Sequence, residues 1–533
     1  MAGERASTTI TVDTNTNDDD QAIDAMLTGD MWDTSVSNLI TYSFIDSASD
    51  VGYSIGATFA NQLSAAQQAA VALALKEYSD VANLTFEEIG DDPGENNANG
   101  TLRYGDFTGL STAFAYYPNS FESGGDMAYL DGQYENPLLG TFAYHTYMHE
   151  TGHALGLKHA HDVNAGLGYP DVGTVPAHLD GGAYTVTTYN SFPGQNQMPA
   201  YYTNAYGNMS QSIMQLDIAA MQRMYGANYN TNNGDTTYTF SETTGEMSID
   251  GVGQGAPVEN VIFRTIWDGD GEDTYDFSNY TTDLNVDLSP GAVTDLDTNG
   301  TTQTAELNAG WDSTGTFVGA AAEVFADGHI YNALLHEGNA QSLIENANGG
   351  SGDDVVTGND ADNTLNGNAG SDVMNGGNGR DRLDGGDDRD FLFGENGNDT
   401  MFGGAARDKL FGGNGDDTLK GQQGRDSLKG MDGDDRLIGH GNKDFLEGGK
   451  GNDILTGSNG IDTFVYVGDR NQGDDQITDF DNGVEVIEMS ARTFADLTIS
   501  DVGTDKLIEW DNSSILLLNQ GGTVIDQNDF MFT

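Results

Sequence analysis

Apolar residues in the first part of the chain recur at helical intervals in some segments and at strand intervals in others. The predicted helices cover residues 21–27, 64–81 and about 141–155. The predicted strands cover residues 39–44, 83–89, 101–104 and 127–130. Helices interspersed with strands favour a domain that packs helices against a sheet.

The pattern changes after residue 228. Short alternating segments such as 261–265 and 284–288, rich in Thr, Asp and Gly, predict a mostly-β connecting region. A nine-residue repeat then runs without slip through thirteen units, and ordinary alternation returns in segments such as 514–518. The predicted division is a polar leader or propeptide at 1–20, a first domain at 21–228, the connecting region at 229–348, the repeats at 349–465 and a C-terminal β region at 466–533.

Each repeat unit combines turn glycines, a carboxylate at the sixth position and an apolar residue at the eighth. The sixth residues, all Asp except Asn363, are Asp354, Asn363, Asp372, Asp381, Asp390, Asp399, Asp408, Asp417, Asp426, Asp435, Asp444, Asp453 and Asp462. The eighth residues are Val356, Leu365, Met374, Leu383, Leu392, Met401, Leu410, Leu419, Leu428, Leu437, Leu446, Leu455 and Phe464. Turns alternating with short strands whose eighth residue points inward predict an all-β parallel β-roll.

The carboxylate column indicates calcium, because Ca²⁺ takes six to eight oxygen ligands in flexible geometry. Without ions the carboxylates would repel one another, and one apolar residue per unit buries little area, so folding is expected to require calcium. The expected ligands are Asp354, Asp372, Asp381, Asp390, Asp399, Asp417, Asp426, Asp435 and Asp453. The turns at 403–408 and 439–444 contain bulk or positive charge, which predicts weak or empty sites. A flexible Gly- and Asp-rich linker would need neither a fixed register nor an apolar column.

Composition narrows the possible partners. The chain has 84 Asp plus Glu against 20 Lys plus Arg, a formal charge of −64, which disfavours nucleic acid and anionic membranes. It has no Cys, so a metal must be bound by His, carboxylate or carbonyl groups. Residues 1–20 contain no apolar core of a secretory signal peptide, and no later segment reaches membrane-spanning length.

A zinc motif lies in the third predicted helix. His149, Glu150, His153, Gly156 and His159 match H-E-x-x-H-x-x-G-x-x-H in full. A helix places the first two His on one face, and the Gly permits the sharp turn that returns the third. Three nitrogens leave one position for water, as in catalytic zinc, and the Glu is placed to act as general base.

Other histidines lie near this motif or beside a carboxylate elsewhere in the sequence. His145 lies four residues before His149, and His161 lies two after His159, so each remains an alternative zinc ligand. His336 is followed by Glu337 without a second His and is predicted to be surface.

Three segments extend the resemblance to a family. Residues 147–159, 217–227 and 267–277 are similar to the zinc helix, the closing helix and the calcium-domain entry of serralysins, and the repeats resemble the RTX family. The resemblance implies a multidomain protein, an α+β metzincin catalytic domain followed by the RTX β-roll. It also implies a secreted zinc endopeptidase exported by type I secretion machinery without an N-terminal signal peptide. The C-terminal residues 529–533 resemble the terminal export signal of that family.

One stretch departs from the family pattern. The family has a turn with a Met beneath the zinc and a Tyr two residues later, and the matching positions here are Thr187 and Tyr189. A rival assignment uses Met214, which no Tyr follows at that spacing. The resemblance implies that Tyr189 can leave the metal and stabilise the oxyanion, and that the missing Met reduces activity without abolishing it.

The expected substrate is a protein or peptide, paired with an edge strand for which residues 125–130 are the candidate. Two functions of other classes stay open. One is a calcium-dependent surface or adhesion protein with a degenerate protease domain. The other is a pore-forming toxin, against which the lack of a long apolar segment counts.

Overall fold

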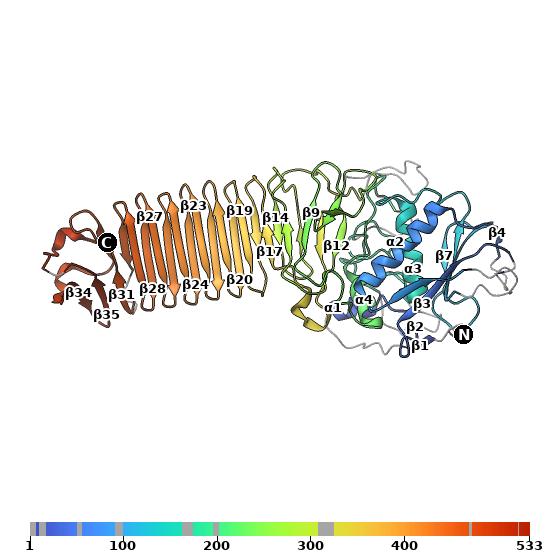
Figure 1. Cartoon of the computed structure of the whole chain (residues 1–533), viewed down its shortest axis with the longest axis horizontal. Coiled ribbons are helices and arrows are strands. Elements are labelled where there is room, and N and C mark those ends of the chain that lie inside the picture. The colour runs from blue at the N-terminus through green and yellow to red at the C-terminus, as the bar shows by residue number, and fades with distance from the viewer. Residues whose placement is uncertain are drawn as a thin grey trace.

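The computed structural model describes residues 7–9, 18–48, 50, 56–90, 100–162, 174–193, 195, 202–307, 324–467, 472–520 and 522–533. The molecule is elongated, with the helices at the N-terminal end and a long ladder of strands leading to the C-terminus (Figure 1). Of the predicted leader at 1–20, residues 7–9 form strand β1 and 18–20 begin helix α1, and the remainder lies outside the described residues.

The first sheet has the order β5-β3-β6-β8-β7, with β4 also paired to β6. Its strands are β3 (Leu39–Phe44), β4 (Thr58–Asn61), β5 (Thr85–Glu88), β6 (Leu102–Thr108), β7 (Phe114–Ala115) and β8 (Asp126–Leu130). All four strands predicted in this region are confirmed, with ends shifted by a few residues. Strands β3, β5, β6 and β8 are parallel, whereas β4 and β7 are antiparallel to their neighbours.

The prediction that residues 125–130 form an edge strand is wrong. Strand β8 lies between β6 and β7, where Ala128 pairs with Phe114 and Met127 with Ala115. The outer strand on this side of the sheet is therefore β7, and β5 lies at the opposite edge. Strand β7 is two residues long, too short to show the alternation that identifies a strand in a sequence.

The described residues of this part form four α-helices: α1 (Asp18–Asp24), α2 (Ala65–Val81), α3 (Phe142–Leu155) and α4 (Gln215–Tyr225). The second and third match their predicted positions, and the first begins three residues before the predicted 21–27. Ser64 caps α2 through a reciprocal pair of hydrogen bonds with Gln67. The buried Tyr78 of α2 donates a hydrogen bond to the carbonyl of Met148 in α3 at 2.8 Å, which fixes the two helices against each other.

The segment after α4 consists of short strands, as predicted. These are β9 (Thr237–Phe240), β10 (Met247–Ile249), β11 (Val252–Gly253), β12 (Arg264–Ile266), β13 (Thr274–Asp276), β14 (Asn285–Asp287), β15 (Val293–Thr294), β16 (Ile330–Asn332) and β17 (Asn346–Asn348). Val261, Phe263 and Tyr331 pack in the core of the first part, whereas Ile262 and Ile330 pack in the core of the roll. The connecting region is thus shared between two cores, and the domain boundaries stay a prediction.

The repeats form two parallel sheets whose strands alternate along the chain (Figure 1). The strands are β18 (Val355–Thr357), β19 (Thr364–Asn368), β20 (Val373–Asn378), β21 (Arg382–Gly386), β22 (Phe391–Asn396), β23 (Thr400–Ala405), β24 (Lys409–Asn414), β25 (Thr418–Gln423), β26 (Ser427–Asp432), β27 (Arg436–Gly441), β28 (Phe445–Lys450), β29 (Ile454–Asn459) and β30 (Thr463–Tyr466). Strands two units apart pair in register, as in Leu410 with Leu428. Every eighth-position side chain is 0% exposed, so the inward column is confirmed.

The C-terminal region continues both sheets of the roll. Strands β31 (Asp474–Ile477), β33 (Thr498–Val502), β34 (Asp505–Trp510) and β35 (Ser513–Leu517) extend one sheet, and β32 (Val486–Met489) and β36 (Phe530–Phe532) extend the other. The predicted strand at 514–518 is confirmed by β35. Among the described residues, no helix combines the length and apolar character needed to cross a membrane.

Replacing Leu419 by Ala should destabilise the roll by about 2–5 kcal/mol, because the change leaves a cavity in a side-chain column that the folded chain cannot close. Urea unfolding of the full chain in saturating calcium, followed by the far-ultraviolet circular dichroism of the β structure, measures this loss. The neighbouring outward substitution Lys420→Ala is the control and should cost far less. Equal losses for the two variants would contradict the apolar column as the main packing interaction.

Candidate metal centres

Helix α3 contains two of the three histidines of the first candidate metal centre. Thr141 caps its start by accepting the N–H of Tyr144 at 3.3 Å. Gly156 ends it with φ of 116°, and a Cβ at this residue would lie 2.6 Å from the carbonyl oxygen of Asp30. Only glycine meets both conditions, so the chain can turn back and bring His159 beside the helix.

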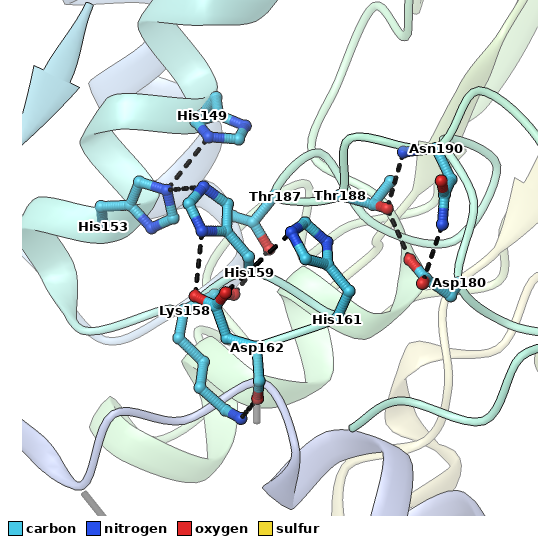
Figure 2. Close-up of polar contacts among 10 residues, drawn as sticks. All are labelled: His149, His153, Lys158, His159, His161, Asp162, Asp180, Thr187, Thr188 and Asn190. Carbon is cyan, nitrogen blue, oxygen red and sulfur yellow. Dashed lines mark hydrogen bonds and ion pairs between the residues drawn. The ribbon is translucent and has the colours of Figure 1, made fainter. Parts of the chain in front are cut away.

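The Nε2 atoms of His149, His153 and His159 converge on one point (Figure 2). The Nε2 of His153 lies 3.0 Å from that of each of the other two. The Nδ1 atom of each ring donates a hydrogen bond. His149 donates to the Val186 carbonyl at 2.7 Å, and His153 donates to the Leu157 carbonyl at 2.8 Å. His159 donates to the Asp162 carboxylate at 3.0 Å. Each ring is therefore fixed in the tautomer that presents an Nε2 lone pair.

The electrostatics of these rings fit a bound cation. Burial, and then the charge of His159, lowers the pKa of His153 to about 3, and burial lowers the pKa of His149 well below its usual value. Both rings are thus neutral near pH 7, as metal ligands must be. Three lone pairs that face one another without a proton between them repel, and a metal ion would remove that repulsion. Three imidazoles in this arrangement fit zinc.

Glu150 lies next to the first ligand on the same helix. Its side chain is buried, and its Oε2 has no hydrogen-bond partner among the described residues. Burial raises the pKa of the Glu150 carboxyl to about 8. A pKa near the working pH suits a group that both accepts and returns a proton, and a cation bound by the neighbouring histidines would favour the ionised form of this carboxyl.

The turn at 184–190 packs against this helix and is held by hydrogen bonds. Asp217 of α4 accepts from the Thr185 hydroxyl and from the Val186 N–H, both at 2.7 Å. The Val186 carbonyl in turn orients His149, as described above. Thr187 is fully buried and donates to the carbonyl of Lys158 at 3.0 Å, next to the third histidine. The polar turn therefore connects α4 to two of the three rings.

Tyr189 lies beside the histidine rings. Its ring stacks on that of His149 with centroids 5.7 Å apart and lies 4.4 Å from that of His159. The side chains before and after it in the chain, Thr188 and Asn190, both donate to the buried carboxylate of Asp180, at 2.5 and 2.9 Å (Figure 2). Asp180 thereby fixes the backbone on both sides of the tyrosine.

The other candidates named from the sequence lie in different surroundings. Met214 is the N-cap of α4, where its sulfur accepts from the Thr265 hydroxyl at 3.7 Å. His145 contacts the Ser210 hydroxyl at 3.0 Å and the Tyr202 hydroxyl at 3.3 Å. His161 stacks on His159 with centroids 5.3 Å apart and does not join the three converging nitrogens. The residues called surface, His336 and Glu337, form a short 3₁₀ turn with no buried side chain.

The second candidate centre is the column of sixth-position carboxylates in the roll. The Oδ1 atom of each aspartate from Asp372 to Asp462 accepts a hydrogen bond from the backbone N–H of the sixth residue 18 positions earlier in the chain. For example, the Asp399 N–H donates to Asp417 at 2.8 Å. The Oδ2 atom is buried without a hydrogen-bond partner, among the described residues, at Asp372, Asp381, Asp390, Asp399, Asp408, Asp417, Asp426, Asp435, Asp444, Asp453 and Asp462. Burial and neighbouring carboxylates raise the pKa of Asp435 to about 8. Repeated unpartnered oxygens in a negative column fit calcium.

Two residues at the ends of this column stand apart from the others. Asp354 is a predicted ligand whose two oxygens both accept backbone N–H groups, from Leu284 at 2.9 Å and Gly350 at 2.8 Å, and its assignment stays a prediction. Asp475 was missed, although its Oδ2 is buried without a partner among the described residues and its Oδ1 accepts from Asp453 N–H at 2.9 Å. Its segment Gly473-Asp474-Asp475 keeps the end of the repeat pattern, but 22 residues separate it from Asp453 where 18 are usual.

Comparison with known families agrees with this arrangement. The profile of the matrixin family matches residues 45–172, and that of the peptidase M10 serralysin C terminal matches 227–306. The profile of the RTX calcium-binding nonapeptide repeat matches 348–383, 375–410, 411–446 and 430–464. The first family implies zinc and the last implies several calcium ions.

The chain is also similar to characterised proteins. It is 31% identical to metallopeptidase AprA of Pseudomonas marginalis over 61% of both chains. It is 30% identical to serralysin G of Dickeya chrysanthemi over 61% of this chain and 60% of the relative. It is 32% identical to serralysin of Proteus mirabilis over 54% of this chain and 53% of the relative. Each alignment thus spans less than two thirds of the relative.

Replacing His159 by Ala should remove zinc from the dialysed protein, because one of three converging nitrogens is lost. The loss of affinity should exceed the roughly 10–100-fold effect of removing an outer hydrogen-bond partner. Atomic analysis of zinc per chain measures it. His145→Ala is the control and should retain the ion, since the His145 nitrogens contact Ser210 and Tyr202. Zinc retained at wild-type affinity after His159→Ala would make His161 or His145 the third ligand.

Proposed function

We propose that this chain, a serralysin-type sequence with RTX repeats over its second half, is a secreted, calcium-stabilised zinc endopeptidase that hydrolyses peptide bonds of extracellular proteins. The observation that supports it most directly is the convergence of three histidine Nε2 atoms next to a buried glutamate whose Oε2 has no partner among the described residues. His149, His153 and His159 would hold the zinc. When bound, zinc supplies a Lewis acid that polarises the scissile carbonyl and lowers the pKa of water.

The chain's own groups supply the proton transfers. Glu150 accepts a proton at Oε2 from the attacking water and delivers it to the nitrogen of the leaving amine. The carboxylate is buried, so its basicity is not weakened by hydration. No acyl-enzyme forms, because water rather than a side chain is the nucleophile.

Tyr189 is proposed to stabilise the oxyanion that forms at the scissile carbonyl. Its hydroxyl is a hydrogen-bond donor throughout the working range, because burial raises its pKa above the usual value. Its ring lies against two of the predicted ligands, and Asp180 fixes the residues on both sides. The phenol is thus positioned before substrate arrives, which limits the reorganisation needed in the reaction.

The substrate backbone is proposed to pair with the outer strand β7 of the first sheet rather than with β8. Residues after β7 approach the centre, since the ring of Tyr117 lies 5.5 Å from that of His153. An extended peptide added beside Phe114–Ala115 would continue the sheet toward the three histidines.

The calcium requirement supports export through type I secretion machinery, which we include in the proposal. Extracellular calcium modules bind at about 10⁻⁴–10⁻³ M, so the repeats would stay unfolded at cytosolic calcium levels and fold outside the cell. The predicted signal at 529–533 overlaps strand β36, which pairs with β32 in the folded protein. The secretion machinery could therefore recognise this segment only before the chain folds.

Replacing Glu150 by Gln should reduce casein hydrolysis by about a hundredfold or more, because the proton acceptor is lost. Zinc per chain should be unchanged, since the three nitrogens remain. Glu87→Gln, an exposed change on β5, is the matched control and should keep full activity. Near-normal hydrolysis by the Glu150 variant would refute the mechanism. A wild-type chain that binds zinc and does not hydrolyse casein or gelatin would favour the adhesion alternative.

Replacing Thr187 by Val should lower kcat/KM by about three- to tenfold, the effect of one lost hydrogen bond of about 1 kcal/mol, because the Lys158 carbonyl loses its donor. Thr187→Ser keeps the hydroxyl and should stay near wild type. Zinc content should not change in either variant. If Val and Ser behave alike, the hydroxyl has no role in positioning this turn.

A further inference from the structure

The turns of the roll lie along two edges, because consecutive strands alternate between the two sheets. We call one set the oxygen-lined edge: the turns at 378–381, 396–399, 414–417, 432–435 and 450–453, which precede β21, β23, β25, β27 and β29. We call the four middle turns of the other edge the basic edge: those at 387–390, 405–408, 423–426 and 441–444, which precede β22, β24, β26 and β28. The outer turns on the same side, at 369–372 and 459–462 before β20 and β30, have no cation. Both edges contain the buried sixth-position aspartates.

The backbone of the two edges differs at the fourth position. On the oxygen-lined edge this residue is always glycine, at 379, 397, 415, 433 and 451, with φ between 113° and 145°. A Cβ on Gly397 would lie 1.5 Å from the carbonyl oxygen of Gly379, so side chains are excluded there. On the basic edge the same position is Asp388, Ala406 and Asn442 with φ of 70°, 76° and 77°, and Gly424 with 158°. The carbonyl groups of the two edges are therefore set differently.

The fifth position differs between the edges at every turn but one, since Arg380 occupies it in the first turn of the oxygen-lined edge. On the oxygen-lined edge, side-chain oxygens of Asn398, Asp416 and Asp434 each accept the N–H of the fifth residue in the next turn, at 3.1, 2.9 and 2.7 Å. On the basic edge the stacked fifth residues are Arg389, Arg407, Arg425 and Lys443, which form no ion pair among the described residues. In-register strands stack successive turns about 4.8 Å apart, so these four cations form a row.

The charges of the two edges follow from these residues. Over positions three to six, the five oxygen-lined turns have two cations, Arg380 and Lys450, and eight carboxylates, Asp381, Asp399, Asp416, Asp417, Asp432, Asp434, Asp435 and Asp453. The four basic turns have four cations, Arg389, Arg407, Arg425 and Lys443, and six carboxylates, Asp387, Asp388, Asp390, Asp408, Asp426 and Asp444. Most of the negative charge of the basic edge is therefore neutralised by the chain itself.

The buried column itself is alike on the two edges. The Oδ2 atom has no hydrogen-bond partner among the described residues at Asp390, Asp408, Asp426 and Asp444 on the basic edge, and at Asp399, Asp417, Asp435 and Asp453 on the oxygen-lined edge. The two edges therefore differ at the fourth and fifth positions and not at the sixth.

We propose that, among these nine turns, calcium binds along the oxygen-lined edge and not along the basic edge, where a row of Arg and Lys residues and a different backbone at the fourth position disfavour it. Calcium needs six to eight oxygens, whereas guanidinium and ammonium groups offer no acceptor and repel a second cation. The basic turns therefore do not fit calcium, which revises the sequence-based expectation for Asp390 and Asp426. The inference is independent of peptidase activity.

The test counts calcium ions per full-length chain by equilibrium dialysis and atomic analysis, on Asp417→Asn and Asp408→Asn. The two residues are matched: they are 2% and 0% exposed, and their Oδ1 atoms accept an N–H at 2.8 and 3.0 Å. Asp417→Asn is expected to lose at least one ion per chain and Asp408→Asn none. Equal losses, or no loss from Asp417→Asn, would overturn the proposal.

A gain-of-binding variant keeps the test valid if Asp417→Asn fails to fold, which circular dichroism in saturating calcium reveals. Ala406→Gly combined with Arg407→Asn gives the basic turn the glycine and the fifth-position oxygen of the other edge. This double variant is expected to bind at least one more calcium ion per chain than wild type. An unchanged number would overturn the proposal, because the turn would then exclude calcium for another reason.

Discussion

Repulsion between stacked carboxylates is the constraint on which the second half of the molecule depends. In-register parallel strands repeat every side chain about 4.8 Å further along, so one buried aspartate per turn becomes a line of like charges. The apolar column inside the roll contributes a single residue per unit and cannot offset that repulsion alone. A bound cation would offset that repulsion, which is the role proposed for calcium.

The three-histidine site of the first part is also built from groups that repel one another. Three imidazole lone pairs face one another, and each ring is fixed from behind by an acceptor on a different part of the chain. Those acceptors trace back to α4 through Asp217 and to the segment after α3 through Asp162. The turn that would contain a methionine in the family pattern instead uses the Thr187 hydroxyl, so hydrogen bonding takes over part of what apolar packing would provide.

The sequence was informative wherever one residue type had to recur at a fixed interval. The inward column of the roll, helices α2 and α3 and the spacing of the three histidines could be predicted, because periodicity and metal geometry leave few alternatives. Strand β7 could not be predicted, since two residues show no periodicity. Asp475 was not recognised as part of the column, because the spacing from Asp453 is 22 residues rather than 18. The hydrogen bonds of Asp180 and Asp217 join residues distant in the sequence, and no local pattern predicts such pairs.

The strands at the ends of the roll influence whether copies of the chain associate end to end in concentrated solution. Two parallel in-register sheets have the geometry of a fibril, and their open ends would accept the roll of another copy. The fifteen-stranded sheet is closed at one end by the antiparallel pair β10 and β11 and at the other by β33 and β34. Reversing the strand direction removes the matching template for a further parallel strand. The antiparallel strands at both ends of this sheet thus disfavour end-to-end polymerisation through it, whereas the ten-stranded sheet ends in the parallel strands β14 and β36.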